Sequence, residues 1–248
     1  MSAWEIFVDK LIAGNGYKLV LTGLLNTAII AVFGLIIGFL IGSVCAVVKS
    51  IPTYTSKLPV VFQKIVDIYV TIFRGTPMVV QLLIMHFILM PTLGIRVPSI
   101  IFSQNFVIDG VVIEAIMAFA LNSGAYMSEI MRGGIDSVDK GQLEAGRALG
   151  LSYPSAMISI VVPQAFKNVL PTLGNEFIAL IKETSVCSFI AVNDLTKSFQ
   201  NIAASTYEYI VPYIVLAVVY LVIVLIITYI VHLVERRLHK NDRNNQFA

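Results

Sequence analysis

The sequence is poor in charge for its length. Only 13% of its 248 residues are Asp, Glu, Lys or Arg, whereas a soluble domain typically carries roughly a quarter. At the same time, 57% of the residues are hydrophobic and the mean hydropathy is +0.85. A single soluble core does not need this much apolar material, so the composition indicates an integral membrane protein.

Cysteine is also scarce. The two cysteines, Cys45 and Cys187, lie in apolar runs at a spacing that fits no metal site, so we expect packing residues without a disulfide bond. Residues 1–15 contain Glu5 and Asp9 and lack a long apolar core, so we expect no cleavable signal peptide.

The sequence lacks G-x-x-x-x-G-K-[ST], the loop that cradles the phosphates of a nucleotide. We therefore expect that the chain does not hydrolyse ATP by itself and binds no cofactor of its own. Its residues also suggest no metal-ligand cluster, catalytic triad or paired-carboxylate site. These absences argue against an enzyme.

Long apolar runs dominate the chain instead. Five of them are long enough, or nearly so, to cross about 30 Å of hydrocarbon. They cover approximately residues 19–48, 60–90, 111–131, 172–192 and 209–234. The second is interrupted by Arg74, Gly75 and Pro77, and the fourth contains Lys182 and Glu183. Both runs need a structural or functional reason for these residues. We predict an all-α membrane protein with about five spanning helices.

The flanking Lys and Arg residues indicate an orientation, since they favour the inner side of a membrane. With the N-terminus outside, eleven lie on the inside: Lys49, Lys57, Lys64, Arg132, Lys140, Arg147, Lys167, Arg236, Arg237, Lys240 and Arg243. Four lie on the outside: Lys10, Lys18, Arg96 and Lys197. We predict one transmembrane domain over residues 1–248 with its N-terminus outside and its C-terminus inside.

Two further patterns concern packing. Residues 1–15 favour an interfacial helix on the outer leaflet, although a frayed lead-in to the first span is the alternative. The apolar residues that recur there at helical spacing are Trp4, Phe7, Val8, Leu11 and Ile12. Within the first run, Gly34, Gly38 and Gly42 stand four apart, which predicts the close approach of a neighbouring helix.

Residues 132–170 separate the third and fourth runs and are too polar to span. Asp139 can cap a helix, and Gln142, three residues later, can complete a capping box. That helix would end at Gly150, which suits a left-handed turn.

A second short helix is predicted directly after this corner. Ser152 can cap it, Pro154 fits its first turn, and Pro163 marks its end or a kink. Two short helices joined at a glycine would form a rigid body that can dock on a partner and transmit force to it. An ordinary ordered loop is the alternative.

One motif lies within this segment: Glu144-Ala145-Gly146, three residues, Gly150, nine residues, then Ile160-Val161-Val162-Pro163. It resembles the EAA motif of ABC-importer membrane subunits, written EAA-x3-G-x9-I-x-L-P. Gly146 replaces the second alanine and Val162 replaces the leucine, and both changes are small or conservative. We call residues 132–170 the EAA segment.

Other segments resemble the polar amino-acid branch of the same family, and together the resemblance covers about residues 17–235. They are Arg74-Gly75-Thr76-Pro77 with Gln81-Leu82; Asn122-Ser123-Gly124-Ala125-Tyr126 with Glu129-Ile130 and Arg132-Gly133-Gly134-Ile135; Pro163-Gln164-Ala165; Asn175-Glu176; and Lys182-Glu183-Thr184-Ser185.

The resemblance implies a type I ABC importer fold in a bacterial cytoplasmic membrane. It implies two separate ATPase subunits that bind ATP and Mg, a second membrane subunit, an extracellular or periplasmic solute-binding protein, and polar or basic amino acids as cargo. Membrane lipid surrounds such a subunit, and no nucleic acid is expected. We expect a homodimer, with a related partner chain as the alternative. The residues implied to couple to the ATPase are Glu144, Ala145, Gly146 and Gly150.

The substrate path should contain polar groups that lipid would otherwise penalise, since a charge at mid-membrane costs about 2.5–3.5 kcal/mol on insertion scales. Charges of both signs also suit a zwitterionic amino acid. The candidate path residues are Arg74, Thr76, Gln81, Asn122, Tyr126, Glu129, Lys182, Glu183, Thr184 and Ser185. Asn122 and Tyr126 lie one helical turn apart, which favours a shared role.

Several candidates have a structural alternative. Arg74 could instead pair with Asp67 or cap carbonyls freed by Pro77, and Glu129 favours an ion pair with Arg132.

The neighbours Lys182 and Glu183 point about 100° apart on a helix, so one of them is expected to face another helix or subunit. His86, in an apolar stretch, is expected to be packed or hydrogen-bonded rather than a proton relay.

Two other functions compete. A secondary transporter driven by an ion gradient would explain the charges but leaves the EAA segment without a purpose, and five spans without an internal repeat suit it poorly. A membrane scaffold or sensor would use that segment for docking but has no need of polar groups at mid-membrane. Dependence on a co-expressed ATPase distinguishes the three.

Overall fold

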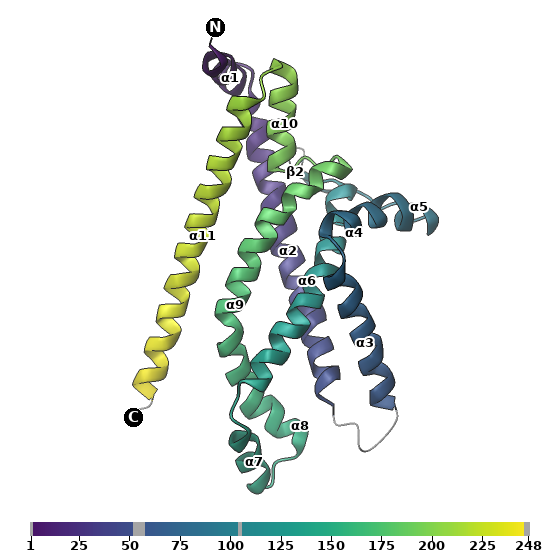
Figure 1. Ribbon diagram of the computed structural model, residues 1–248, viewed down its shortest axis with the longest axis vertical. Helices are drawn as coiled ribbons and strands as arrows, with labels where there is room; N and C mark the ends of the chain where they lie inside the picture. Colours follow the sequence, from purple (N-terminus) through teal and green to yellow (C-terminus); the bar gives the residue numbers. More distant parts are fainter. Residues whose placement is uncertain (1, 52–57, 104–105, 246–248) are drawn as a thin grey trace.

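The computed structural model describes residues 2–51, 58–103 and 106–245. Long helices run along one axis as an elongated bundle, and short helices gather at both of its ends (Figure 1). In chain order the elements are α1 (Ala3–Ile12), α2 (Gly16–Ser50), α3 (Leu58–Gly75), α4 (Met78–Ile84), the π-helix η1 (Met85–Leu89), α5 (Met90–Thr92), the strands β1 (Ile100–Ser103) and β2 (Phe106–Ile108), α6 (Gly110–Asp136), α7 (Lys140–Ala148), α8 (Tyr153–Ala156), the π-helix η2 (Met157–Val161), α9 (Val162–Glu183), the 3-10 helix η3 (Thr184–Ile190), α10 (Leu195–Thr206) and α11 (Ile210–Asn245).

Four helical stretches of the described chain are long and apolar enough to cross a membrane. They are Gly16–Ser50, Gly110–Asp136, Tyr153–Ile190 and Ile210–Arg237. A fifth crossing results if Leu58–Gly75 and Met78–Thr92, which meet at 109°, form one broken span. The helical architecture with about five spans is therefore as predicted, and the second span breaks where Gly75 and Pro77 interrupt the apolar run.

The glycine face of the first span packs against α6, as its spacing predicted. A β-carbon on Gly38 would lie 2.7 Å from Cβ of Ser123, and one on Gly42 would overlap Cβ of Met127. Because neither glycine has a side chain, the backbones of α2 and α6 approach closely along much of their length.

A small helical cap closes the end of the bundle that carries the N-terminus. Ser2 and Glu5 form a capping box at the start of α1. Phe7 is buried and stacks on Phe199 of α10, with 6.5 Å between ring centroids, whereas Trp4 is exposed. The helix thus has one face on the protein and one face free, which an interfacial helix requires.

The N-terminus of α10 is capped by Asp194. Its carboxylate accepts hydrogen bonds from the backbone N–H groups of Thr196, at 3.1 Å, and Lys197, at 2.9 Å. Burial raises the pKa of Asp194 to about 6, while these bonds oppose the rise. The cap is therefore mostly ionised at neutral pH.

The corner inside the EAA segment contains the two predicted short helices, with one difference at the cap of the first. Asp139 caps α7 by accepting from the N–H of Gly141 at 2.6 Å, so the cap is made one residue earlier than the predicted capping box with Gln142. Past the end of α7, Gly150 has a φ of +90°, and the N–H of Leu151 bonds to the carbonyl of Gly146 at 3.1 Å. This is a Schellman turn, which fixes the direction of the chain.

The second short helix does not end at Pro163, so of the two predicted outcomes, an end or a kink, the first is wrong. Ser152 caps α8 as predicted, but the helix continues through the π-helix η2 into α9. A π-turn shifts the hydrogen-bond register, so it can accommodate a residue without an N–H inside a continuous helix. The fourth helix therefore begins far ahead of residue 172, where the apolar run begins.

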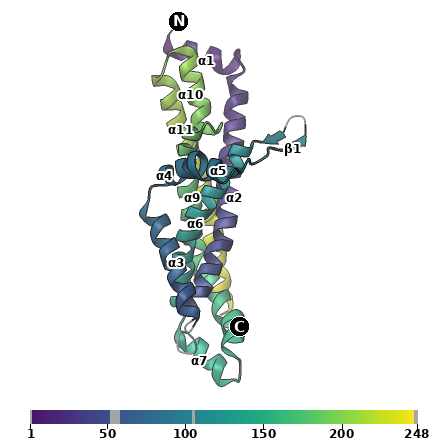
Figure 2. The same cartoon turned by 90° about the vertical axis from the view of Figure 1, so that its right-hand side faces the viewer.

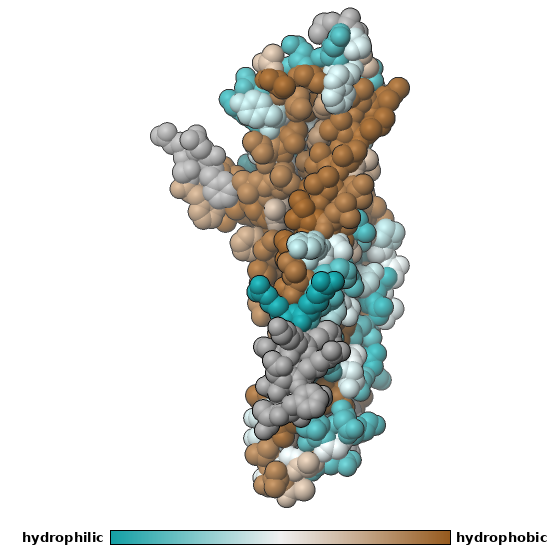
Figure 3. All heavy atoms as spheres, turned by 90° about the vertical axis from the view of Figure 1, so that its left-hand side faces the viewer, coloured by the Kyte–Doolittle hydropathy of each residue, from teal (hydrophilic) through white to brown (hydrophobic). Residues whose placement is uncertain are grey.

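The helix α11 packs against α9 and α10 on one side and leaves its other side exposed, while the β-hairpin lies at the edge of the bundle. Side chains of α11 such as Ile214, Leu221 and Leu225 are exposed, and Figure 3 shows an apolar band on this face with hydrophilic residues above and below it. Strands β1 and β2 pair antiparallel and project sideways from the bundle (Figure 2). This hairpin is a small addition to the predicted all-helical fold.

We predict that Gly42→Leu destabilises the protein by about 1–3 kcal/mol, because the new side chain cannot fit between α2 and α6 without displacing them. The matched control is Gly133→Leu on α6, where a β-carbon would meet nothing within 4 Å. The measurement is the fraction of purified protein that stays monodisperse after heating. Equal thermal profiles for the two variants would contradict the packing argument.

Candidate functional site

The break between α3 and α4 is held together by the side-chain amide of Gln81. Its Nε2 donates to the carbonyl of Phe73 at 2.8 Å, to the carbonyl of Thr76 at 3.0 Å and to Thr76 Oγ1 at 2.8 Å. Asn122 of α6 donates to Gln81 Oε1 at 3.0 Å. These bonds pair backbone groups that the 109° bend removes from the helical ladder.

Three of the predicted path residues therefore have a structural task at the bend. Thr76, Gln81 and Asn122 form one hydrogen-bonded group, and Asn122 is buried. The same bonds explain why an apolar run contains these polar residues, since irregular backbone at membrane depth must find partners within the protein. The carbonyls beside Pro77 are capped by Gln81 rather than by Arg74.

A cluster of charges, the Glu129 cluster, joins α2, α3 and α6. Glu129 Oε1 lies 2.9 Å from Lys49 Nζ, and its Oε2 lies 2.8 Å from Arg132 Nη2 and 3.9 Å from Arg74 Nη1. Lys49 Nζ is also 2.9 Å from Asp67 Oδ1. The predicted pair between Glu129 and Arg132 is present.

Arg74 differs from both of its structural alternatives. Its partner is Glu129, whereas Asp67 pairs with Lys49. The Arg74 guanidinium also lies over the ring of Tyr126, with 5.4 Å between Cζ and the ring centroid. At 3.9 Å its ion pair is the longest in the cluster, and its side chain is 44% exposed. Arg74 is therefore the member best placed to exchange one partner for another.

The remaining predicted residues lie where α9 passes into η3. Lys182 and Glu183 are exposed in the single chain, Ser185 is half-buried, and Thr184 is buried with its hydroxyl donating to the carbonyl of Ile181 at 2.7 Å. η3 packs against α4, just beyond the bend. The predicted path residues thus lie on or beside α3, α4, α6 and the α9–η3 junction. Of these elements, α6 contacts α3, α4 and α9, and α4 contacts η3.

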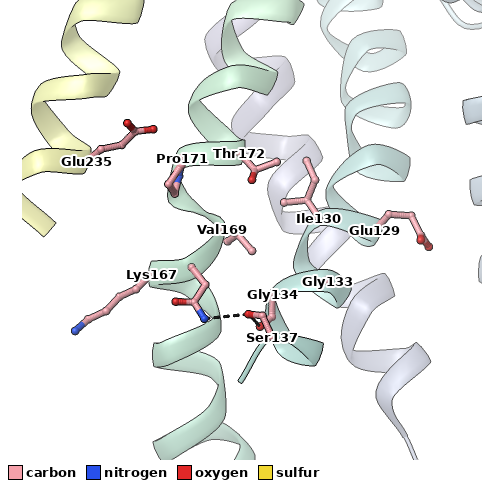
Figure 4. Close-up of a pocket in the computed structure, with 11 residues that line it drawn as sticks. Glu129, Ile130, Gly133, Gly134, Ser137, Lys167, Val169, Pro171, Thr172 and Glu235 are labelled. Atoms are coloured by element: carbon pink, nitrogen blue, oxygen red, sulfur yellow. Dashed lines mark hydrogen bonds between the residues drawn. The ribbon is translucent and has the colours of Figure 1, made fainter. Parts of the chain in front are cut away.

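A cleft of about 570 Å³ lies between α6, α9 and α11 near the end that carries α7. Across it, the amide of Asn168 donates to the hydroxyl of Ser137 at 2.9 Å. Figure 4 shows Glu129 pointing away from the α9 side. Of the ten predicted path residues, Glu129 alone is among the described residues that line this cleft. The cleft and the Glu129 cluster therefore meet at Glu129, whose carboxylate points away from the α9 side (Figure 4).

A second cavity of about 830 Å³ lies between η1, the start of α6 and residues 191–193. His86 and the buried Glu114 line it, with 2.6 Å between Nδ1 and Oε2. The expectation that His86 is hydrogen-bonded is confirmed. Cys45 and Cys187 are buried free thiols, as predicted.

The residues of the EAA motif divide into an outward and an inward group. Glu144 and Ala145 are exposed on α7, whereas Gly146 is buried, and a β-carbon there would lie 2.7 Å from Cδ1 of Ile160. This contact shows that α7 packs closely against η2 at Gly146. Gly150 forms the corner.

Leu149 is a residue that the sequence analysis missed. Its side chain is 86% exposed at the tip of the corner, beside the exposed face of α7. A large apolar side chain held out on a capped turn is suited to a docking contact. The one signal in the sequence that could have identified Leu149 is its position, directly before the glycine that ends a predicted helix.

Comparison with known proteins identifies the family of this chain. Residues 38–240 match the family described as "binding-protein-dependent transport system inner membrane component". The chain belongs to this family, and it is a multi-pass protein of the bacterial inner membrane with a type I ABC importer permease fold.

The relatives include transport permeases of known name. The arginine transport system permease protein ArtQ of Bacillus subtilis is 40% identical, over 90% of this chain and 94% of that protein. The L-cystine transport system permease protein TcyB of the same organism is 35% identical, over 82% and 81%.

Solved structures agree with the fold. A crystal structure of an amino acid ABC transporter with histidines has a TM-score of 0.76 and 35% identity, over 92% of this chain and 98% of that one. An inward-facing MetNI methionine ABC transporter has a TM-score of 0.64 and 18% identity, over 90% and 95%. At 18% identity, this second match supports the fold alone.

We predict that Gln81→Leu destabilises the protein, because the carbonyl of Thr76 loses the Gln81 donor and the carbonyl of Phe73 is left with Asn122. A polar group left unsatisfied within the protein costs about 1–3 kcal/mol. The control is Gln142→Leu at an exposed position of α7. The measurement is again the monodisperse fraction after heating. If Gln81→Leu were as stable as Gln142→Leu, the amide would not hold the bend, and a contact with substrate would be the better explanation for it.

Proposed function

We propose that the chain is the transmembrane subunit of an ATP-driven importer and forms the translocation path for polar or basic amino acids. The observation that carries the proposal is the 40% identity with an arginine transport permease over 90% of the chain. Charges of both signs beside the bend add support, since an amino acid has a carboxylate and an ammonium group.

ATP and Mg would bind in two partner subunits, because the chain lacks the nucleotide-binding loop. The surface for these partners is the exposed face of α7 with the corner behind it. Glu144 and Ala145 would contact the ATPase, Leu149 would bury its apolar side chain there, and Gly146 and Gly150 would hold the corner rigid. With the excess of Lys and Arg on the same side, this end would lie in the cytoplasm.

The helix that leaves the corner supports a mechanical link. α8, η2, α9 and η3 follow one another without a break from Tyr153 to Ile190, so a displacement of the corner is passed along a helix to Lys182 and Glu183. Both side chains are exposed in the single chain, and charges at membrane depth need protein or water around them. A second membrane subunit, which we expect to be another copy, would complete the path on this side, and a solute-binding protein would deliver cargo from outside.

We predict that Gly150→Val lowers amino-acid uptake per ATP hydrolysed at least about five-fold. A β-branched residue at a φ of +90° is strained, so the corner would lose its shape. Gly150→Asn is the matched control, since asparagine tolerates positive φ, and it should retain most coupling. The assay is uptake and ATP hydrolysis in liposomes that contain the ATPase and the binding protein.

A normal uptake ratio for Gly150→Val would remove the EAA segment from the coupling mechanism. Uptake by the unaltered chain without any ATPase, driven by an ion gradient, would instead indicate a secondary transporter.

A further inference from the structure

The lower arm of the broken span, α3, is held to the bundle mainly by polar contacts. Among its residues only Val70 is buried, while Phe62, Ile65 and Ile68 are exposed. Its inward polar contacts include those of Asp67 and Arg74 in the Glu129 cluster and the hydroxyl of Tyr69, which donates to the carbonyl of Leu121. The side-chain amide of Gln63 also donates to the carbonyl of Ile51, just past the end of α2, at 2.9 Å. Little apolar area therefore opposes a movement of α3 away from α2 and α6.

One ammonium group joins the three helices. Lys49 Nζ, near the end of α2, lies 2.9 Å from Asp67 on α3 and 2.9 Å from Glu129 on α6. The Lys49 side chain is only 17% exposed, so water screens these pairs less than it would at an open surface. If Lys49 were removed, Glu129 would still have Arg132, but Asp67 would lose its partner on α2. The hydrogen bonds from Gln63 to the backbone carbonyls at the end of α2 would be left to tie α3 to α2.

The residue after Lys49 contacts the EAA segment. The hydroxyl of Tyr153, in the first turn of α8, donates to the carbonyl of Ser50 at 3.2 Å. The end of α2 therefore lies between α8 on one side and α3 on the other. A shift of α8 therefore acts on the backbone at Ser50, which is one residue from Lys49.

We propose that Lys49 is a positioning residue that passes the movement of α8 to α3, and so sets where Arg74 stands at the bend. In the arrangement seen here, Lys49 holds Asp67 and Glu129 together. When α8 moves the end of α2, Lys49 can keep one carboxylate and release the other, which gives α3 two discrete positions. This inference rests on the proposed function, because it assigns the source of the movement to the docked ATPase.

The first test measures the opening of α3 directly. In the complete transporter, with Cys45 and Cys187 replaced by alanine, a single cysteine at Val70→Cys reports opening through its rate of alkylation by a membrane-permeant maleimide. Lys49→Met should raise this rate at least about five-fold without nucleotide. Lys64→Met, at an exposed position of α3, is the matched control and should leave the rate unchanged.

Transmission from the EAA segment is tested with Tyr153→Phe, which removes only the hydroxyl. The alkylation rate at position 70 should change on adding ATP in the parent protein and lose most of that change in Tyr153→Phe. Uptake per ATP should fall at least about five-fold in Lys49→Met and recover in Lys49→Arg, which restores a cation at that position.

The outcomes separate the two proposals. If the parent protein takes up amino acids with ATP, and Lys49→Met matches Lys64→Met in both alkylation and coupling, the role of Lys49 is wrong while the proposed function stands. If the parent protein shows no ATP-dependent uptake, the proposed function fails, and this inference fails with it.

Discussion

Hydrocarbon offers no hydrogen-bond partners, and the rest of this structure depends on that constraint. A span that bends by 109° must supply partners for its freed backbone groups from the protein itself. Gln81, Thr76 and Asn122 supply them. The same constraint explains why α3 turns an apolar face outward and a polar seam inward, which is the reverse of a helix in a soluble protein.

A polar seam holds a helix differently from an apolar core. Apolar packing fills its space closely and resists displacement, whereas a shared carboxylate such as Glu129 can serve one cation or another. The tight α2–α6 pair, with Gly38 and Gly42 at its contact, forms the fixed part of the molecule. Against it lie α3, held by charges, and the continuous helix that runs from the corner at Gly150 towards Lys182. A transporter needs both, a fixed frame and parts with more than one stable position.

Much of the fold follows from local signals in the sequence. The apolar runs, the glycines of α2 and the break before Pro77 predict the helices, one packing face and the bent span. Gly150 predicts the corner because only a few residues tolerate its φ of +90°. The sequence predicts the pair of Glu129 with Arg132, which lie on one helix, but not the pairs of Lys49 with Asp67 and Glu129, since these residues are brought together by the tertiary fold. The same holds for the helix that continues past Pro163, where the sequence allows an end or a kink and the structure has a register shift in η2. It also holds for Leu149, whose exposure depends on the turn around it.

The most direct test of the account is uptake of labelled arginine, histidine, glutamine and glutamate by the unaltered chain in liposomes. Its ATPase and binding protein would be present, and the ATPase would be either active or inactivated in its nucleotide site. The account predicts accumulation of at least one of these amino acids against a gradient with the active ATPase and none with the inactive form. Equal accumulation with both forms would contradict it.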